Sequence, residues 1–292
     1  MAAASSSITP RVTASSNGLD ALRYLTLDEK PKDANGLLDT AEAVAAMVDK
    51  LHELPIHPPS LYVHLEGVDL SRHGTISILQ IHVRTSHQNY LVDVKTLGET
   101  AFSTQGTRTS TTLKAILESP LIPKVFFDIR NDSDALYSHY QIKVQGIQDL
   151  QLMELATRFG HKDFVTGLKK CIERDLPMTR TERLNWIKTK DEGLKLFAPE
   201  KGGSYEVFNE RPLPEKVRMY CVQDVHFLPR LWDVYNREMI PTWRAKVEDA
   251  TKARVVESQA PGFEAKGKHK TLAPEGWEPR GRDRQVMGML FV

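Results

Sequence analysis

Two polar side chains interrupt an apolar run of the sequence at a spacing that allows them to act together. His64 and Glu66 lie two residues apart in the segment Leu61-Tyr-Val-His-Leu-Glu-Gly67. If this segment is a β-strand, both side chains project from one face of a sheet, because side chains alternate along a strand. Polar groups in an apolar strand are costly unless they are paired, and a metal ion at the sheet face would pair them. A strand with one solvated face explains the same pattern and is favoured when the segment is taken alone.

The surrounding elements predict a mixed α/β fold. Three runs with alternating or β-branched residues follow one another through short polar links, which indicates an antiparallel meander. Strand and helix then alternate, so we expect a mixed sheet with helices on both faces. The predicted strands cover residues 61–67, 75–83, 89–94 and 124–127, and the predicted helices cover 37–54 (with Thr40 as a candidate N-cap), 111–118, 131–140 (opened by an Asn cap), 150–159, 180–196 and 219–235.

Composition excludes few classes of function. The chain has 292 residues, 40% of them hydrophobic, and a net charge of +1, so any nucleic-acid surface must be a local basic patch. Cys171 and Cys221 have no metal-type spacing, and a reduced intracellular setting, cytoplasm or nucleus, is the expectation. No apolar run reaches the length of a membrane span.

Both ends differ in composition from the middle. Residues 1–36 begin with an Ala/Ser-rich stretch that we interpret as a flexible tail, with a weak organellar transit peptide as the alternative. Residues 241–292 contain basic, Gly-containing stretches that are typical of a flexible tail. The catalytic or binding domain is therefore expected at 37–240.

Two later segments complete a pattern with His64-Leu-Glu66. One runs from Lys124 through Phe-Asp-Ile-Arg-Asn-Asp-Ser-Asp to Leu136, and the other joins Arg211-Pro-Leu to Tyr220-Cys-Val-Gln-Asp224. In this order, the three segments resemble the 3′–5′ exonuclease superfamily that includes RNase D and the exonuclease domain of Werner helicase. The resemblance covers roughly residues 37–235. It implies an RNase H-like fold and a signature of four acids, Asp, Glu, Asp and Asp, with a Tyr four residues before the last.

The resemblance also implies a centre of two divalent ions, Mg²⁺ or Mn²⁺, held by oxygen ligands. By position, Glu66 and Asp224 would bind the ion that activates the attacking water, and Asp132 would support the other ion. Tyr220 lies one helical turn before Asp224 and would orient the water. Taken alone, Asp132, Tyr220 and Asp224 are each better explained by an ordinary helix position, whereas their joint order and context favour function.

The acid of the second segment has three candidates. Asp128 and Asp134 compete with Asp132, which we prefer because its distances in sequence from Lys124 and Leu136 fit the family motif.

The chain departs from the family where His64 replaces the first Asp. A neutral imidazole offers one lone pair and cannot bridge two ions as a carboxylate does. It also removes a negative charge from a site that must hold two divalent ions. His64 could still be a terminal ligand to Mn²⁺ or Zn²⁺. The expected outcome is a weakened exonuclease or, as the alternative, an inactive nucleic-acid-binding or adaptor protein; a structural domain with no nucleic-acid role is a weaker third reading.

The expected partners are 3′ ends of single-stranded RNA or DNA, and the sequence does not identify protein partners. Phosphate contacts are predicted for Arg72, Lys124 and Arg130. Four lysines in or near a charged helix are further candidates, for most of which a solvated helix face is the better interpretation: Lys188, Lys190, Lys195 and Lys201.

Overall fold

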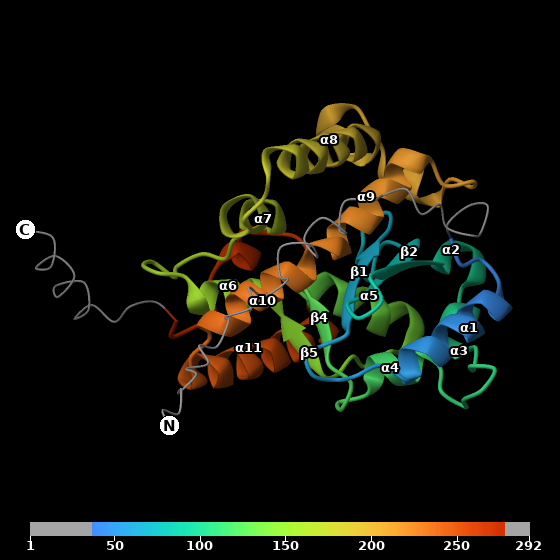
Figure 1. Ribbon diagram of the computed structural model, residues 1–292, viewed down its shortest axis with the longest axis horizontal. Helices are drawn as coiled ribbons and strands as arrows, with labels where there is room; N and C mark the ends of the chain where they lie inside the picture. Colours follow the sequence, from blue (N-terminus) through green and yellow to red (C-terminus); the bar gives the residue numbers. More distant parts are fainter. Residues whose placement is uncertain (1–36, 278–292) are drawn as a thin grey trace, which may run out of the picture. The chain divides into compact units, whose positions relative to one another are not determined.

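Five strands form one mixed sheet in the computed structural model, which describes residues 37–277 (Figure 1). The strand order is β3-β2-β1-β4-β5. The meander β1 (Leu61–Glu66), β2 (Ile78–Val83) and β3 (Gln88–Asp93) is antiparallel, whereas β4 (Lys124–Phe126) and β5 (Ile147–Asp149) extend it in parallel. The predicted mixed α/β sheet is therefore confirmed. β5 was not predicted, because its residues, Ile147, Gln148 and Asp149, lack the apolar run that marks β4.

The alternation along β1 separates two faces of the sheet. Leu61, Val63 and Leu65 are buried in the core beneath α1 (Ala41–His52) and α5 (Arg130–Tyr140). His64 and Glu66 point to the opposite face, which α9 (Glu215–His226) covers as it crosses β1 and β2 (Figure 1). The period of two thus places the polar pair of β1 beneath a helix.

The predicted helices at 111–118, 150–159 and 180–196 are confirmed with small changes at their ends, whereas the helices that begin at Val94, Thr100 and Leu168 were not predicted. The chain forms α2 (Val94–Leu97), α3 (Thr100–Ser103), α4 (Leu113–Glu118), α6 (Leu150–Thr157), α7 (Leu168–Asp175), α8 (Arg180–Phe197), α10 (Leu228–Glu238) and α11 (Pro241–Gln259), with short 3₁₀ turns η2 (Pro199–Lys201), η3 (Tyr205–Asn209) and η4 (Lys268–Thr271). None of the helices between residues 37 and 277 is long and apolar enough to cross a membrane.

The structure corrects the predicted helix at 219–235 and the predicted cap of the helix at 131–140. The expected helix over 219–235 is two helices, α9 and α10, which meet at Phe227. Pro229 explains the break, because proline is tolerated in the first turn of a helix and disrupts its interior. The Asn cap expected for the helix at 131–140 is wrong, since α5 begins at Arg130 and its N-cap residue, Ile129, makes no side-chain hydrogen bond.

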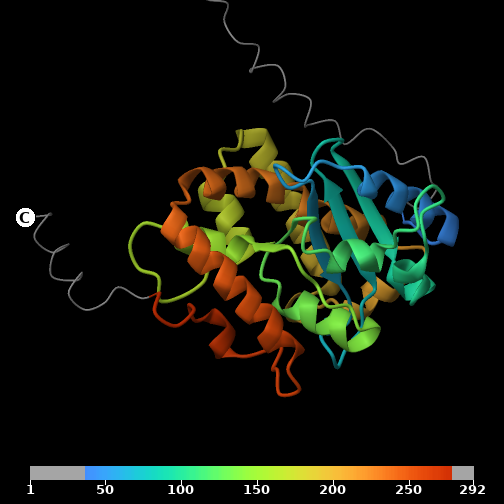
Figure 2. The same cartoon turned by 90° about the horizontal axis from the view of Figure 1, so that it is seen from below.

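The predicted flexible tail does not begin at residue 241. Instead, α11 packs along α5 and α6 (Figure 2). Its buried positions, Val247, Thr251, Arg254 and Ser258, have helical spacing, but three of the four are polar or charged. Apolar periodicity therefore fails to reveal this helix. Residues 278–292 of the predicted tail, and all of 1–36, lie outside the described residues.

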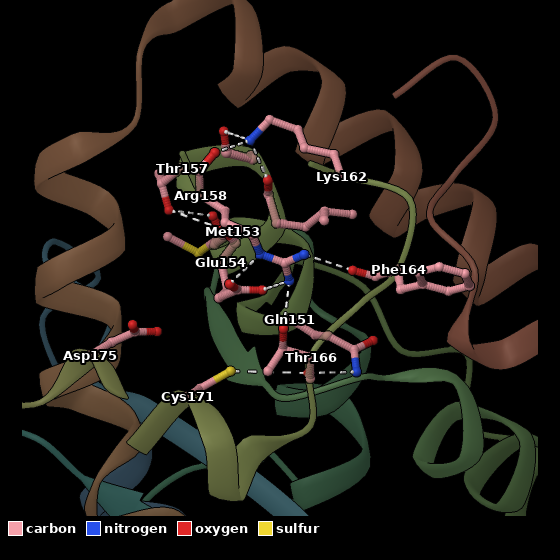
Figure 3. A network of polar contacts seen from close by, with 12 residues as sticks. Gln151, Met153, Glu154, Thr157, Arg158, Lys162, Phe164, Thr166, Cys171 and Asp175 are labelled. Atoms are coloured by element: carbon pink, nitrogen blue, oxygen red, sulfur yellow. Dashed lines mark hydrogen bonds and ion pairs between the residues drawn. The ribbon is translucent and has the colours of Figure 1, made fainter. Parts of the chain in front are cut away.

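A polar network fixes the connection between α6 and α7 (Figure 3). Glu154 is buried in α6 and accepts hydrogen bonds from Arg158, at 2.8 Å from Nε, and from Arg174 of α7. Arg158 also donates to the carbonyl oxygen of Phe164, at 2.8 Å, and to the Thr166 hydroxyl. The buried Glu154 carboxylate therefore has two guanidinium partners for its hydrogen bonds. Because Arg158 lies at the start of the loop and Arg174 lies in α7, these bonds fix both ends of the loop.

Candidate active site

The polar pair of β1 meets an acid of α5. His64 Nε2 lies 3.5 Å from Glu66 Oε1, and His64 Nδ1 lies 3.7 Å from Asp132 Oδ1. The same Asp132 oxygen accepts a hydrogen bond from the Leu65 backbone N–H at 3.0 Å, which fixes the start of α5 against the end of β1. The structure therefore brings together His64, Glu66 and Asp132, as the sequence predicted.

Two further residues of the site, Tyr220 and Asp224, come from α9. Tyr220 and Asp224 are buried on the face of α9 that covers the sheet, one turn apart as predicted. One ligand atom each from His64, Glu66 and Asp224 lie within 4.8 Å of one another. Among residues 37–277, this is the one group of three or more His, Cys, Asp or Glu side chains close enough to hold a metal ion.

A lysine from α8 enters the same site. Lys190 Nζ lies 2.7 Å from Asp224 Oδ1, 2.8 Å from the Tyr220 hydroxyl oxygen and 4.1 Å from the centre of the Tyr220 ring. Sequence reasoning placed Lys190 among several lysines of a charged helix and assigned it no role in the site. Its contacts depend on the packing of α8 against α9, to which no spacing in the sequence points.

The crowding of charges shifts the titration of the site. Burial opposes protonation of His64, but the hydrogen bond to Glu66 and the charges of the surrounding acids outweigh it and raise the pKa of His64 to about 9. Burial and the neighbouring carboxylates raise the pKa of Asp132 to about 7, although His64 opposes the shift. Burial, Asp224 and Glu66 raise the pKa of Tyr220 well above its ordinary value, so its hydroxyl keeps its proton.

The donor set fits one divalent ion. His64 supplies a ring nitrogen, and Glu66 and Asp224 supply hard oxygens, a combination that suits Mn²⁺ or Mg²⁺ with water completing the shell. A second ion has no bridging carboxylate at position 64, and one Asp132 oxygen is already engaged by the Leu65 N–H. The residues present therefore fit a one-ion centre better than the two-ion centre that the resemblance implied.

The two alternative acids of the second segment are bound elsewhere. Asp128 forms an ion pair with Arg130 at 2.6 Å, and Asp134 forms one with Arg72 at 2.7 Å. Of the three aspartates weighed from the sequence, Asp132 is the one whose carboxylate lies next to His64.

The three predicted nucleic-acid contacts have intramolecular partners, and this corrects their assignment. Besides Asp134, Arg72 donates to the carbonyl oxygens of Ser258 in the last turn of α11 and of Ala260 and Pro261 just after it. Arg130 donates to Asp128 and to the Lys270 carbonyl oxygen. Lys124 is fully buried, and its Nζ donates to the carbonyl oxygens of Ile116 and Ser119. The basic side chains of this region stabilise the fold, and a phosphate has no access to Lys124.

Replacing Lys124 by methionine is expected to change how stability depends on pH. Burial lowers the pKa of Lys124 from 10.5 to about 7 in the folded protein. Between these two values the unfolded chain binds one proton more than the folded chain, so this lysine makes the free energy of unfolding rise with pH, by at most about 1.4 kcal/mol per pH unit. Urea unfolding between pH 7 and pH 10 should show this rise in the natural chain, and Lys124→Met should lose it. An unchanged slope in the variant would mean that Lys124 stays protonated in the folded protein.

Comparison with known sequences gives a matching family and relatives among curated proteins. Residues 37–240 match the sequence model of a 3′–5′ exonuclease family. The piRNA biogenesis protein EXD1 of Bombyx mori is 27% identical over 184 residues, which cover 61% of this chain and 50% of that protein. EXD1 of Mus musculus is 36% identical over 95 residues, covering 32% of this chain and 15% of that protein. The chain thus spans half or less of the length of these relatives.

Solved structures support the same assignment at the level of the fold. RNase D of Trypanosoma brucei in complex with RNA U12 superposes with a TM-score of 0.64 at 21% identity, covering 82% of this chain and 76% of that chain. RNase D of Escherichia coli gives a TM-score of 0.54 at 17% identity, covering 77% of this chain and 50% of that chain. The mixed sheet and its helices are thus the RNase H-like fold expected from the sequence. Because the family match extends over most of the chain and includes both β1 and α9, the chain belongs to the 3′–5′ exonuclease family.

Proposed function

We propose that this protein is a divalent-ion-dependent 3′–5′ exonuclease of single-stranded RNA whose rate is reduced by His64. The observation that carries the proposal is that one ligand atom each of His64, Glu66 and Asp224 lie within 4.8 Å of one another, beside Tyr220. Family membership supports the reaction class. RNA is favoured over DNA because the T. brucei RNase D with the same fold was solved in complex with RNA.

The reaction is hydrolysis of the last phosphodiester bond. A water oxygen attacks the phosphorus, the bond to the 3′ oxygen of the preceding nucleotide breaks, and the products are a nucleoside 5′-monophosphate and a chain with a new 3′-hydroxyl. A divalent ion at the site supplies Lewis-acid chemistry, because it polarises phosphate oxygens and lowers the pKa of water. The protonated hydroxyl of Tyr220 lies at the edge of the site and would orient the attacking water by a hydrogen bond.

The charge of the site explains why the rate should be low. Glu66, Asp132 and Asp224 supply three carboxylates, where the family signature has four. Before any ion binds, two cations, Lys190 and a protonated His64, lie beside these acids, and His64 must lose its proton before its ring nitrogen can bind an ion. The remaining negative charge is too small for two divalent ions, so charge developing on the leaving 3′ oxygen is stabilised less than in a two-ion centre.

A second function, binding of RNA without hydrolysis, is favoured by the same pair of cations. With Lys190 on Asp224 and His64 on Glu66, the acids are partly neutralised before any ion is bound. The two relatives of this chain among curated proteins are both called piRNA biogenesis proteins, which fits a role in handling small RNA. In this case the chain would hold a 3′ end and present it to other proteins.

Digestion of 5′-labelled single-stranded RNA separates these two functions. With Mn²⁺, the natural chain should produce a ladder that shortens from the 3′ end, and a chelator should stop it. Asp224→Asn should abolish the ladder, because asparagine keeps nearly the same shape but lacks the negative charge that an ion needs. Asp249→Asn, an exposed position of α11, is the matched control and should leave it unchanged. RNA retained by the natural chain without shortening would establish the binding function in place of the exonuclease.

A further inference from the structure

Lys190 holds a place in the site that a divalent ion would need. Its ammonium group lies 2.7 Å from Asp224 Oδ1, and Asp224 is one of the three residues that fit an ion. The side chain is 13% exposed, so solvent screens the ion pair only partly. Two cations that share one carboxylate repel each other, and each weakens the binding of the other.

The packing of α8 against α9 holds Lys190 in this position. One turn before it, the carbonyl oxygen of Trp186 accepts a hydrogen bond from Gln223 Nε2 of α9 at 3.0 Å. One turn after it, a Cβ atom on Gly193 would lie 2.5 Å from Cδ2 and 2.8 Å from Cβ of Tyr220. Any side chain other than hydrogen at position 193 would push the helices apart. Residues at positions 186, 190 and 193 thus lie on one face of α8, and the packing of this face against α9 places the ammonium group beside Asp224.

We propose that Lys190 couples RNA binding to ion binding, an inference that rests on the proposed function. In the free protein, the ammonium group neutralises Asp224 and competes with a divalent ion for this carboxylate. A terminal RNA phosphate at the site offers Lys190 a second anionic partner, since lysine binds phosphate as a flexible point charge. Transfer of Lys190 from Asp224 to the phosphate frees the carboxylate, so RNA tightens ion binding. By linkage, the ion tightens RNA binding by the same factor.

This coupling would keep the centre poorly loaded until a 3′ end arrives. Lys190 is then a positioning residue, because it acts on the ion through Asp224 in the free protein and contacts the phosphate only in the complex. The inference differs from the proposed function in that it concerns the order and affinity of binding and requires no hydrolysis.

Titration with Mn²⁺, followed by the electron paramagnetic resonance of free Mn²⁺, tests the coupling without measuring activity. It is done with and without single-stranded RNA whose terminal linkage is a phosphorothioate, on the natural chain, Lys190→Met and Lys190→Arg. In the absence of RNA, Lys190→Met should bind Mn²⁺ about tenfold more tightly than the natural chain, because a competing cation is gone. Lys190→Arg keeps the charge and should remain weak. RNA should tighten Mn²⁺ binding to the natural chain and should have little effect on Lys190→Met.

Lys188→Met, at an exposed position of the same helix, is the matched control and should behave like the natural chain. Circular dichroism confirms that each variant is folded. Mn²⁺ affinity that is unchanged or lower in Lys190→Met, or an RNA effect that survives in it, would overturn the inference. Coupled Mn²⁺ and RNA binding with no digestion of unmodified RNA would instead contradict the exonuclease function and leave the coupling intact.

Discussion

Replacing His64 by aspartate is expected to increase the rate of 3′-end hydrolysis by about 10²–10³-fold, which corresponds to about 3–4 kcal/mol of transition-state stabilisation. The variant regains a carboxylate that can contribute two oxygens and bridge two ions. It also removes an imidazole that lies 3.5 Å from Glu66 and 3.7 Å from Asp132 and competes for both acids. The net charge of the site becomes more negative, which favours a second divalent ion.

The ratio kcat/KM on 5′-labelled single-stranded RNA in Mn²⁺ measures this gain. His64→Asn is the control, because it removes the imidazole without adding a charge or a bridging carboxylate, and it should gain little. A His64→Asp variant that is folded and no faster than the natural chain would mean that position 64 does not limit the reaction. The explanation of the reduced rate would then be wrong.

Replacing Asp149 by alanine is expected to lower the free energy of unfolding by about 3–5 kcal/mol. Asp149 is fully buried at the end of β5 and lies 2.7 Å from the guanidinium of Arg254 in α11. It also accepts backbone hydrogen bonds from Asp128 and Gln151, both at 3.0 Å, and from Ile129 at 3.3 Å. Its removal leaves a buried arginine without its closest partner and frees three backbone donors, and both effects destabilise the fold.

Urea unfolding of the natural chain and Asp149→Ala measures this loss. The matched control is Asp233→Ala, which removes the partner of Arg84 at 2.9 Å, but Asp233 is 49% exposed. Such a partly solvated pair should contribute less than about 1 kcal/mol. Equal losses in the two variants would contradict the view that Asp149 anchors α11 to the sheet. Adding Arg254→Leu to Asp149→Ala should recover part of the loss, because no unpaired charge then remains.

The parts of the fold that the sequence predicted are those whose buried residues are apolar. The meander follows from alternation in β1 and β2, and the strand and helix periods place His64 with Glu66 and Tyr220 with Asp224. By contrast, α11 was missed because its buried face includes Arg254 and Thr251, which find partners or burial only in the tertiary structure.

Charged residues are difficult to assign from the sequence for the same reason, because the tertiary structure decides which partners they have. Arg72 and Arg130 were expected to bind phosphate, whereas Asp134 pairs with Arg72, Asp128 pairs with Arg130, and carbonyl oxygens accept their remaining hydrogen bonds. The one local signal was that Arg130 lies two residues after Asp128. For Lys190 there was no such signal, because its contact with Asp224 requires α8 to approach α9 at Gly193.

The number of Mn²⁺ ions bound per chain tests the central claim most directly, namely that His64, Glu66 and Asp224 form a one-ion centre on an exonuclease fold. It is measured by the same titration in the presence of phosphorothioate RNA. We expect one ion per natural chain, and loss of that ion in Asp224→Asn. Two ions in the natural chain, or one ion that survives in Asp224→Asn, would contradict it.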